Sequence, residues 1–337
     1  MNSSERLYTR LRGKPVDKIP NMNIAMGLVA KLAGVTYCEY VQDYQKLVEG
    51  NLICADRFGF DSVSVISDPM REASAYGAVL KFPENGVPYS DPPLLADGLD
   101  LSHVDIFDPL EKPRTLDRIK GVELLRQKVQ SDYPVIGWVE GVLAEAADLR
   151  GVNALMQDLV EDEDGYQDRL FELMDVVYQQ QCRFALEQIK AGADIIGVGN
   201  AVASLIGPRL YEEFGLSYDK GLVEYIQQNG AKVKLHICGN ITAILPLLVQ
   251  VSPDIIDIDW MVDFGKAAGI FADTKTNVSG NVDPVAVLLQ GTAEYVEKKV
   301  LECATIDDPT FLIAAGCEVP IATPEENLIL MDKLLYL

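Results

Sequence analysis

The chain has 337 residues, of which 48% are hydrophobic and 24% are charged. This is ample apolar material for a large core, and it excludes a disordered or fibrous protein. The 51 acidic and 29 basic residues give a formal net charge of −22, so nucleic acid and anionic membranes are not expected partners. No apolar run reaches the roughly 18 residues of a membrane span, and the N-terminal segment lacks a signal-peptide pattern. We therefore expect a cytoplasmic protein.

Short β-branched runs alternate with amphipathic helical segments along the chain. A helical pattern spans roughly 164–190 and precedes Gly192, and another runs from Pro208 to near Gly230. Eight runs read as strands: 19–24, which is the weakest, 61–66, 134–139, 194–199, 232–237, 254–258, 275–280 and 310–315. Eight strand–helix units in a chain of this length predict an α/β fold of the (β/α)8 TIM-barrel type, with a doubly wound open sheet as the alternative.

The predicted barrel has two additions. An N-terminal helical extension precedes the first strand, and residues 81–113 form a long insertion between the second and third strands, rich in Pro, Gly and Asp. Long insertions of this kind commonly act as lids or docking surfaces. Because no Pro/Gly/Ser linker divides the sequence, we expect residues 1–337 to form one domain.

A thiol and an imidazole lie at the end of one predicted strand. His236 and Cys238 are two residues apart, so they point the same way, and Cys317 follows the last strand. In a closed barrel these strand ends open on the same face, where active sites of this fold lie. One imidazole and two thiols favour zinc and leave a fourth position open. The alternative is a packed histidine beside two buried thiols.

The remaining cysteines are expected to be reduced and structural: Cys38, Cys54, Cys182 and Cys303. In the strand that follows His236, Asp257 and Asp259 share one face. Asp259 is nearer the strand end and is the candidate fourth metal ligand, although it could also be a solvent-exposed or helix-capping carboxylate. Lys234 points into the barrel and needs a carboxylate partner there, for which Asp257 is the natural candidate.

The order of several motifs resembles the uroporphyrinogen decarboxylase superfamily, and within it the methylcobamide:coenzyme M methyltransferase branch. The resemblance covers nearly the whole chain. It rests on His236-Ile-Cys238-Gly-Asn, Gly280-Asn-Val-Asp-Pro284, Gly316-Cys317, Thr323-Pro-Glu-Glu-Asn327, and the opening Glu5-Arg-Leu7 and Leu11-Arg-Gly-Lys-Pro-Val-Asp17. The His-x-Cys…Cys triplet is its most specific part, because it separates zinc methyltransferases from true decarboxylases.

The resemblance implies a TIM barrel in which His236, Cys238 and Cys317 bind zinc. It also implies that Glu140, Asn200 and Asn281 contact the cofactor or line the cavity. Two positions differ from the usual family pattern. Residues 140–144 read Glu-Gly-Val-Leu-Ala instead of Glu-Gly-Pro-Phe-Thr, and Asn200 replaces an aspartate.

The implied activity is transfer of a methyl group from a methyl-corrinoid, carried by a small corrinoid protein, to a thiol such as coenzyme M. The alternatives are a lyase acting on a tetrapyrrole and a non-enzymatic corrinoid- or tetrapyrrole-binding protein. Decarboxylases of the family resemble one another in an arginine-rich stretch at the first strand, whereas residues 21–27 contain no arginine. Methyl transfer is therefore the preferred prediction.

Overall fold

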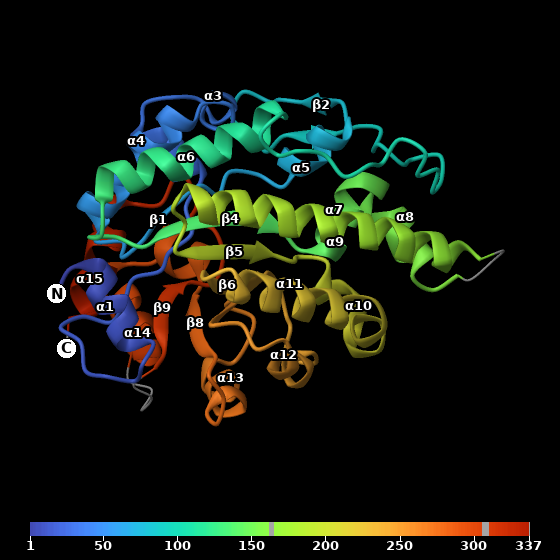
Figure 1. Ribbon diagram of the computed structural model, residues 1–337. Coiled ribbons are helices and arrows are strands. Elements are labelled where there is room, and N and C mark those ends of the chain that lie inside the picture. Colours follow the sequence, from blue (N-terminus) through green and yellow to red (C-terminus); the bar gives the residue numbers. More distant parts are fainter. Residues whose placement is uncertain (162–164, 305–309, 337) are drawn as a thin grey trace.

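The computed structural model describes residues 1–161, 165–304 and 310–336. Its central feature is a curled, all-parallel sheet of seven strands in the order β1-β4-β5-β6-β7-β8-β9 (Figure 1). The strands are β1 (Val63–Ser64), β4 (Val135–Glu140), β5 (Ile195–Gly199), β6 (Lys232–Ile237), β7 (Ile255–Ile258), β8 (Asn277–Val282) and β9 (Leu312–Ala315). This confirms the predicted parallel α/β architecture.

The segment predicted as the first strand, 19–24, closes the sheet without forming a regular strand. Asn21 makes a single parallel bridge to Ile313 of β9, and its carbonyl accepts the Asp61 N–H at 2.8 Å just before β1. Pro20 has no N–H to donate, and the Asn21 N–H bonds to the Asp61 carboxylate at 2.8 Å. The prediction of a full strand here was wrong, because these donors are missing from the ladder.

Helices surround the sheet and connect its strands (Figure 1). Their bounds are α1 (Ser3–Arg10), α2 (Gly27–Leu32), α3 (Tyr37–Tyr40), α4 (Tyr44–Phe58), α5 (Met70–Tyr76), α6 (Pro113–Val129), α7 (Val142–Arg150), α8 (Val152–Asp158), α9 (Tyr166–Ala191), α10 (Ala203–Leu210), η1 (Tyr211–Gly215), α11 (Leu216–Gln228), α12 (Leu245–Val251), α13 (Phe264–Phe271), η2 (Pro284–Leu289), α14 (Ala293–Ala304) and α15 (Glu325–Leu334). α1 is the predicted N-terminal extension.

The two long helical predictions are confirmed within a few residues. α9 ends at Gly192, whose positive φ of 113° suits a left-handed cap. The predicted helix from Pro208 is preceded by four helical residues, but Gly207 breaks the helical geometry with φ 70° and ψ 173°. The helical path therefore restarts at Pro208 and continues through η1 and α11.

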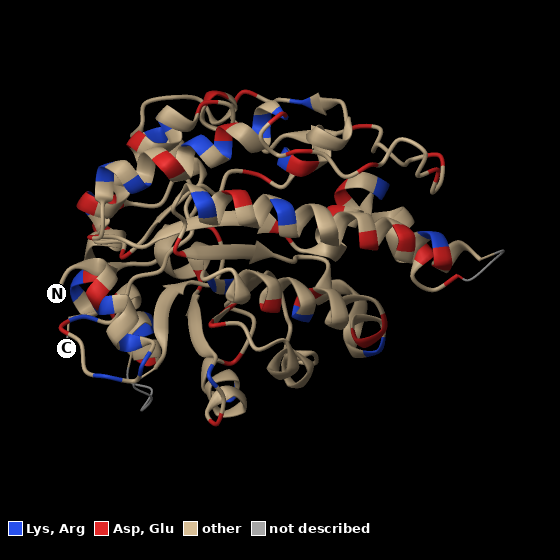
Figure 2. Cartoon of the chain, viewed as in Figure 1, with Lys and Arg blue, Asp and Glu red and all other residues tan. Residues whose placement is uncertain are grey.

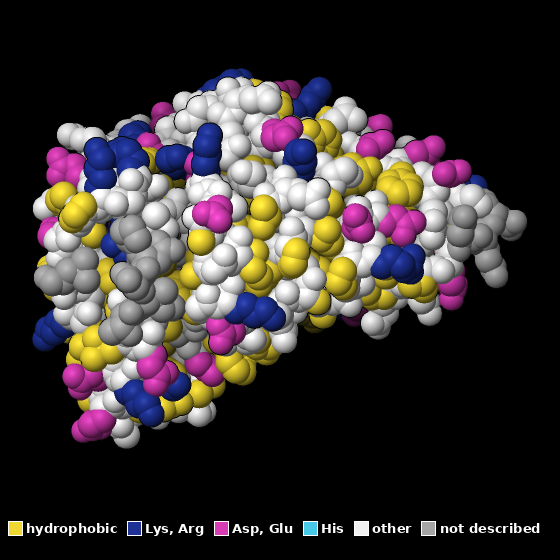
Figure 3. All heavy atoms as spheres, turned by 90° about the horizontal axis from the view of Figure 1, so that it is seen from below, with side chains coloured by type: hydrophobic (Ala, Val, Ile, Leu, Met, Phe, Trp, Pro, Cys, Tyr) yellow, Lys and Arg dark blue, Asp and Glu magenta, His cyan; other side chains and the backbone are white. Residues whose placement is uncertain are grey.

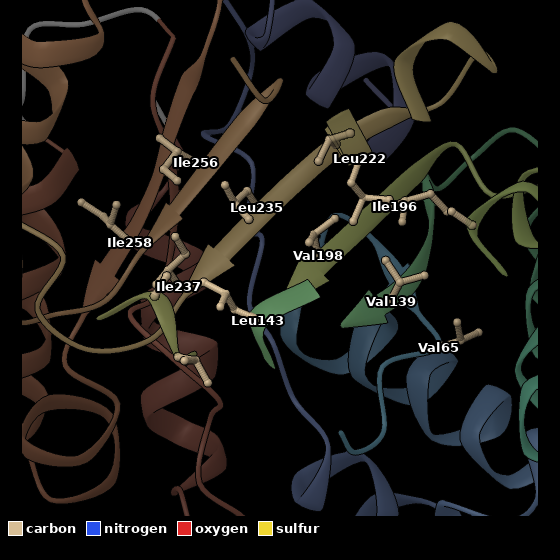
Figure 4. Packing of buried hydrophobic residues seen from close by; sticks show 14 of the residues in the cluster. Val65, Val139, Leu143, Ile196, Val198, Leu222, Leu235, Ile237, Ile256 and Ile258 are labelled. Atoms are coloured by element: carbon tan, nitrogen blue, oxygen red, sulfur yellow. The ribbon is translucent and has the colours of Figure 1, made fainter. Parts of the chain in front are cut away.

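Strand alternation produces two apolar layers. Side chains such as Val139, Val198, Leu235 and Ile258 leave the sheet toward the helices and form the larger core (Figure 4). The intervening residues point into the barrel, where the apolar ones form a second cluster: Ile136, Trp138, Ile195, Ile255, Leu312 and Ala314 among them. Polar side chains that share this inward direction are thereby forced into the barrel interior.

Trp138 fills much of the barrel because the next strand has no side chain opposite it. A Cβ added at Gly197 would lie 2.1 Å from the Trp138 ring. The indole therefore packs directly against the β5 backbone.

The insertion at 81–113 begins with a small antiparallel pair, β2 (Leu80–Lys81) and β3 (Tyr89–Ser90). The rest of it, up to α6, contains no further helix or strand. The arrowheads of β4 and β5 point toward the side on which this segment, α8 and α10 lie (Figure 1). The insertion thus borders the carboxyl ends of the strands.

Charged residues lie mainly on the helices and loops around the sheet (Figure 2). On the face seen from below, acidic, basic and hydrophobic side chains are intermingled (Figure 3). Among the described residues, no helix has both the length and the apolar character needed to cross a membrane.

Candidate metal centre

Three potential metal ligands meet at the carboxyl ends of β6 and β9. His236 and Cys238 project inward from the end of β6, and Cys317 follows β9 after one glycine. His236 Nε2 lies 3.1 Å from Cys238 Sγ, which lies 3.6 Å from Cys317 Sγ. All three ligand atoms lie within 4.8 Å of one another. We call this group the thiol–imidazole cluster.

The backbone before Cys317 passes very close to the loop after β7. A Cβ at Gly316 would lie 2.2 Å from the Trp260 N atom, so a larger residue would displace this turn. Gly316 therefore allows the chain to bring Cys317 to the other two ligands.

The neighbouring strand orients the histidine. The β6–β7 register places Asp257 opposite His236, and its Oδ2 lies 3.0 Å from His236 Nδ1. The same oxygen lies 3.0 Å from Lys234 Nζ, which confirms the predicted Lys234–Asp257 pair. With Nδ1 facing this carboxylate, Nε2 points toward the thiols, the arrangement that metal-binding histidines usually show.

The geometry of the cluster fits zinc. With zinc–sulfur bonds of roughly 2.3 Å and tetrahedral angles, two thiolate sulfurs lie about 3.8 Å apart, close to the 3.6 Å between Cys238 and Cys317. The donor set of one nitrogen and two sulfurs suits zinc and leaves one tetrahedral position for another ligand.

Electrostatics within the cluster favour one protonated and one ionised thiol before a metal binds. The hydrogen bond from Cys238 lowers the pKa of Cys317 to about 4 against the opposing effect of burial. The same bond, together with burial, raises the pKa of Cys238. Burial opposes ionisation of Asp257, but the charge of Lys234 and the hydrogen bond from His236 lower its pKa to about 2. Cys317 is therefore ready to act as a thiolate ligand.

Asp259, the predicted fourth ligand, lies beside the cluster but is not one of the three grouped ligands. Its Oδ2 accepts the Gly239 N–H at 2.6 Å, and its buried Oδ1 has no hydrogen-bond partner among the described residues. Burial raises the pKa of Asp259, although the Gly239 hydrogen bond opposes this shift. The carboxylate is thus held at the turn after Cys238 with one oxygen available.

A cavity of about 180 Å³ opens beside the cluster. Glu140 and Asn200, both predicted to face the cofactor, line it together with Met26, Trp138 and Glu318. Asn200 Nδ2 donates to both oxygens of the buried Asp219 carboxylate at 3.0 and 2.9 Å. The Asn200 Oδ1 atom is buried and has no partner among the described residues.

Asn281 lies elsewhere. Its Nδ2 donates to the carbonyls of Asp259 and Val262 at 3.0 and 2.6 Å, and it borders a separate cavity. In this position Asn281 holds the loop that follows β7. None of the remaining four cysteines belongs to the thiol–imidazole cluster, and all are free thiols.

Behind Glu140 lies a buried group of charges that sequence reasoning missed. Arg71 Nη2 lies 3.1 Å from Glu140 Oε1, and Arg71 Nε lies 3.4 Å from Glu72 Oε2. Glu145 is also fully buried, and neither of its carboxylate oxygens has a hydrogen-bond partner among the described residues. Burial raises the pKa of Glu140 to about 7 despite Arg71, and it raises the pKa of Glu145 further. No local motif marks these residues; only the closed barrel brings α5, α7 and β4 together.

The fold and the cluster together define a class: TIM-barrel proteins with a candidate metal centre at the carboxyl ends of the strands. A solved structure described as a methyltransferase from Methanosarcina mazei shares this fold, with a TM-score of 0.89 at 21% sequence identity over 99% of this chain and 98% of that one.

Sequence comparison then identifies the family. The profile of uroporphyrinogen decarboxylase (URO-D) matches residues 2–334, so the chain belongs to this family. It is 30% identical to "Methylcobamide:CoM methyltransferase MtbA" of Methanosarcina mazei, over 96% of this chain and 94% of the relative. It is 24% identical to "Uroporphyrinogen decarboxylase" of Citrifermentans bemidjiense, over 95% of both chains.

Proposed function

We propose that this protein is a zinc-dependent methyltransferase that moves a methyl group from a methylated corrinoid to a small thiol. The observation that carries the proposal is the thiol–imidazole cluster, at the strand ends of a URO-D-family chain whose relatives include methylcobamide:CoM methyltransferases. Zinc at this cluster would supply a thiolate at neutral pH, because coordination removes the proton of a bound thiol.

The protein's own residues account for the rest of the chemistry. Cys238 and Cys317 as thiolates would offset the charge of the ion, so that the acceptor sulfur keeps its nucleophilicity. Asp257 fixes the imidazole of His236. The cavity wall would hold the acceptor in line with the methyl group. The sulfur–carbon bond forms as the carbon–cobalt bond breaks, the bonding pair stays on cobalt, and the thiol proton passes to solvent.

The residues around the cavity favour methyl transfer over the alternatives. The cavity, with a volume of about 180 Å³, lies beside the thiol–imidazole cluster, where a short thiol can reach the metal. None of the described residues that line it is a lysine or an arginine, so a tetrapyrrole with several carboxylates would find no cation there. Methyl transfer requires only that the cobalt face of the corrinoid reaches the mouth of the cavity.

We further propose that Asp259 occupies or shields the fourth zinc position until a thiol displaces it. Its free Oδ1 supports this role, and a thiolate is a softer ligand than a carboxylate for a metal already bound by sulfur. X-ray absorption with and without thiol tests it. We expect a sulfur at roughly 2.3 Å to replace an oxygen at roughly 2.0–2.2 Å, and an unchanged shell would contradict the exchange.

The remaining assignments complete the proposal. Glu140 and Asn200 would contact the substrates, and a role for Asn281 as a cofactor contact stays a prediction. A small corrinoid protein would deliver the methyl group at the 81–113 insertion of a single-domain barrel. The six free thiols support a cytoplasmic location.

The decisive experiment is demethylation of methylcobalamin, followed by the absorbance of the cobalt centre, with a panel of thiols. Zinc-loaded protein is compared with protein treated with a chelator and then reloaded. We expect thiol-dependent demethylation that is lost with the metal and recovered with zinc. Turnover that is independent of zinc, or absent with every thiol, would contradict the proposed function.

A further inference from the structure

The wall of the cavity beside the thiol–imidazole cluster is mostly apolar, and the charged residues in it are acidic. None of its lining residues, all of which belong to the described part of the chain, is a lysine or an arginine. Three lining residues carry carboxyl groups: Asp68, Glu140 and Glu318. A ligand that carries its own negative charge would therefore find no cation in this wall.

The nearest arginines are already engaged. Arg114 contacts Asp68 through two bonds, from Nη1 to Oδ1 at 2.9 Å and from Nη2 to Oδ2 at 2.6 Å. Arg71 is fully buried and shared between Glu72 and Glu140. An anionic ligand could recruit either arginine only by leaving one of these carboxylates unpaired, which is costly inside a protein.

Glu318 differs from the other two acidic residues of the wall. It directly follows Cys317, and its Oε1 accepts the N–H groups of Gly27 and Met26 at 2.8 and 3.2 Å. It forms no ion pair with any described residue, and its Oε2 has no hydrogen-bond partner among them. The backbone bonds fix the carboxylate, while the second oxygen is left for a ligand next to the metal centre.

We infer that the methyl acceptor is a short thiol with a positively charged amino group, which pairs with Glu318 while the sulfur occupies the open position at the cluster. This inference rests on the proposed function and specifies its substrate class. The bonds made and broken are those of the methyl transfer above, and the ammonium group keeps its protons throughout. The relative named a CoM methyltransferase would differ in this respect, because coenzyme M carries a sulfonate.

Three two-carbon thiols that differ only in the end group test this inference: 2-aminoethanethiol, 2-mercaptoethanol and 2-mercaptoethanesulfonate (coenzyme M). We expect kcat/KM with methylcobalamin, corrected for the thiolate fraction of each compound, to fall in that order. The first and last should differ by about tenfold or more, as one desolvated charge pair can supply. Dissociation constants from calorimetry on zinc-loaded protein should rise in the same order, from 2-aminoethanethiol to coenzyme M.

Glu318→Gln separates a specific contact from the general negative field of the protein. Glutamine keeps an oxygen for the Gly27 and Met26 N–H groups but removes the charge, so the preference for 2-aminoethanethiol over 2-mercaptoethanol should fall to about one. Glu326→Gln is the matched control, because Glu326 is exposed at the start of α15 and does not line the cavity. It should retain the wild-type preference.

The outcomes separate the two proposals. If 2-aminoethanethiol is no better than 2-mercaptoethanol, if coenzyme M is better than 2-mercaptoethanol, or if Glu318→Gln keeps the wild-type preference, the inference is overturned while the methyltransferase function stands. If no thiol is methylated, both are overturned.

Discussion

Cys238 and Cys317 come from strands that are far apart in the sequence, and both are only partly buried at the strand ends. We expect about one zinc per chain in protein purified without chelator. Cys238→Ser and Cys317→Ser should each lose most of it after dialysis, because each removes one of the two thiolate ligands. Elemental analysis measures the metal content, and the thermal melting temperature reports on folding.

Cys38→Ser is the control for these variants, since Cys38 is also partly buried but is not in the cluster. It should retain a full complement of zinc. Full retention of zinc in Cys317→Ser would mean that the metal binds elsewhere.

Asp257 has two tasks, because it faces both His236 and the buried Lys234 at 3.0 Å. Asp257→Asn should destabilise the protein by about 3–5 kcal/mol, since it leaves a buried lysine without its partner. It should also weaken zinc binding by about 10–100-fold through loss of the histidine's support. Urea unfolding and competition with a chromophoric chelator measure the two effects.

The double variant Asp257→Asn/Lys234→Met separates these tasks. Removing the lysine charge should restore most of the lost stability but leave the zinc affinity low. Recovery of both properties together would show that Asp257 acts only through folding.

At the residue scale, the sequence predicts those side-chain directions that depend on local periodicity. Alternation along 232–238 places Lys234, His236 and Cys238 on one face, and the order of parallel strands brings Asp257 beside them. The contacts of Arg71 with Glu72 and Glu140, and the position of Glu318, escaped prediction. Their proximity depends on how the barrel closes and on a turn whose N–H groups bond to a side chain, and neither leaves a pattern in the sequence.

At the scale of elements, one buried carboxylate joins β5 to the helices that follow it. Asp219 of α11 accepts hydrogen bonds from Asn200, at the end of β5, and from the Tyr211 hydroxyl at 2.8 Å. Burial raises the pKa of Asp219 to about 6, although these two hydrogen bonds oppose the shift. The carboxyl group of Asp219 is therefore easier to protonate than one in water.

This shift predicts a pH-dependent stability. Between pH values of about 4 and 6 the folded protein binds a proton at Asp219 that the unfolded chain does not, so the contribution of this group falls as the pH rises through that window. Asp219→Asn cannot titrate. Its stability relative to wild type should therefore improve by up to about 3 kcal/mol from pH 4 to pH 6 and then stay constant.

Denaturant unfolding of both proteins at several pH values gives this difference directly. A hydrogen bond lost in Asp219→Asn would change the difference in unfolding free energy by the same amount at every pH. A difference that stays flat from pH 4 to pH 7 would show that Asp219 has an ordinary pKa.

The elements themselves were largely predictable, for reasons that also explain the exceptions. Runs such as 232–237 combine β-branched residues with two-residue alternation, and they are strands. Segment 19–24 is the weakest of the eight runs, and Pro20 and the Asp61 side chain remove donors that a ladder needs. One β-bridge and a few backbone hydrogen bonds hold this segment in the barrel.

At the scale of the whole molecule, the proposed corrinoid protein must reach the carboxyl ends of the strands. The insertion that borders this side carries exposed acidic side chains, including Asp97, Asp100 and Asp105, above buried anchors such as Leu99 and Val104. Because the anchors are separate from the exposed acids, the surface charge can be changed without disturbing the packing beneath it. Charges at the rim of an interface act mainly on the rate of association.

We expect the triple variant Asp97→Lys/Asp100→Lys/Asp105→Lys to change kcat/KM for transfer from a protein-bound corrinoid by about tenfold or more at low salt. Transfer from free methylcobalamin should change much less. The matched control reverses three exposed acids near the amino ends of β1, β4 and β8: Asp56, Asp132 and Asp273. This control alters the net charge equally but leaves the insertion intact, so it should change both donors alike. An equal effect of the insertion variant on both donors would place the docking surface elsewhere.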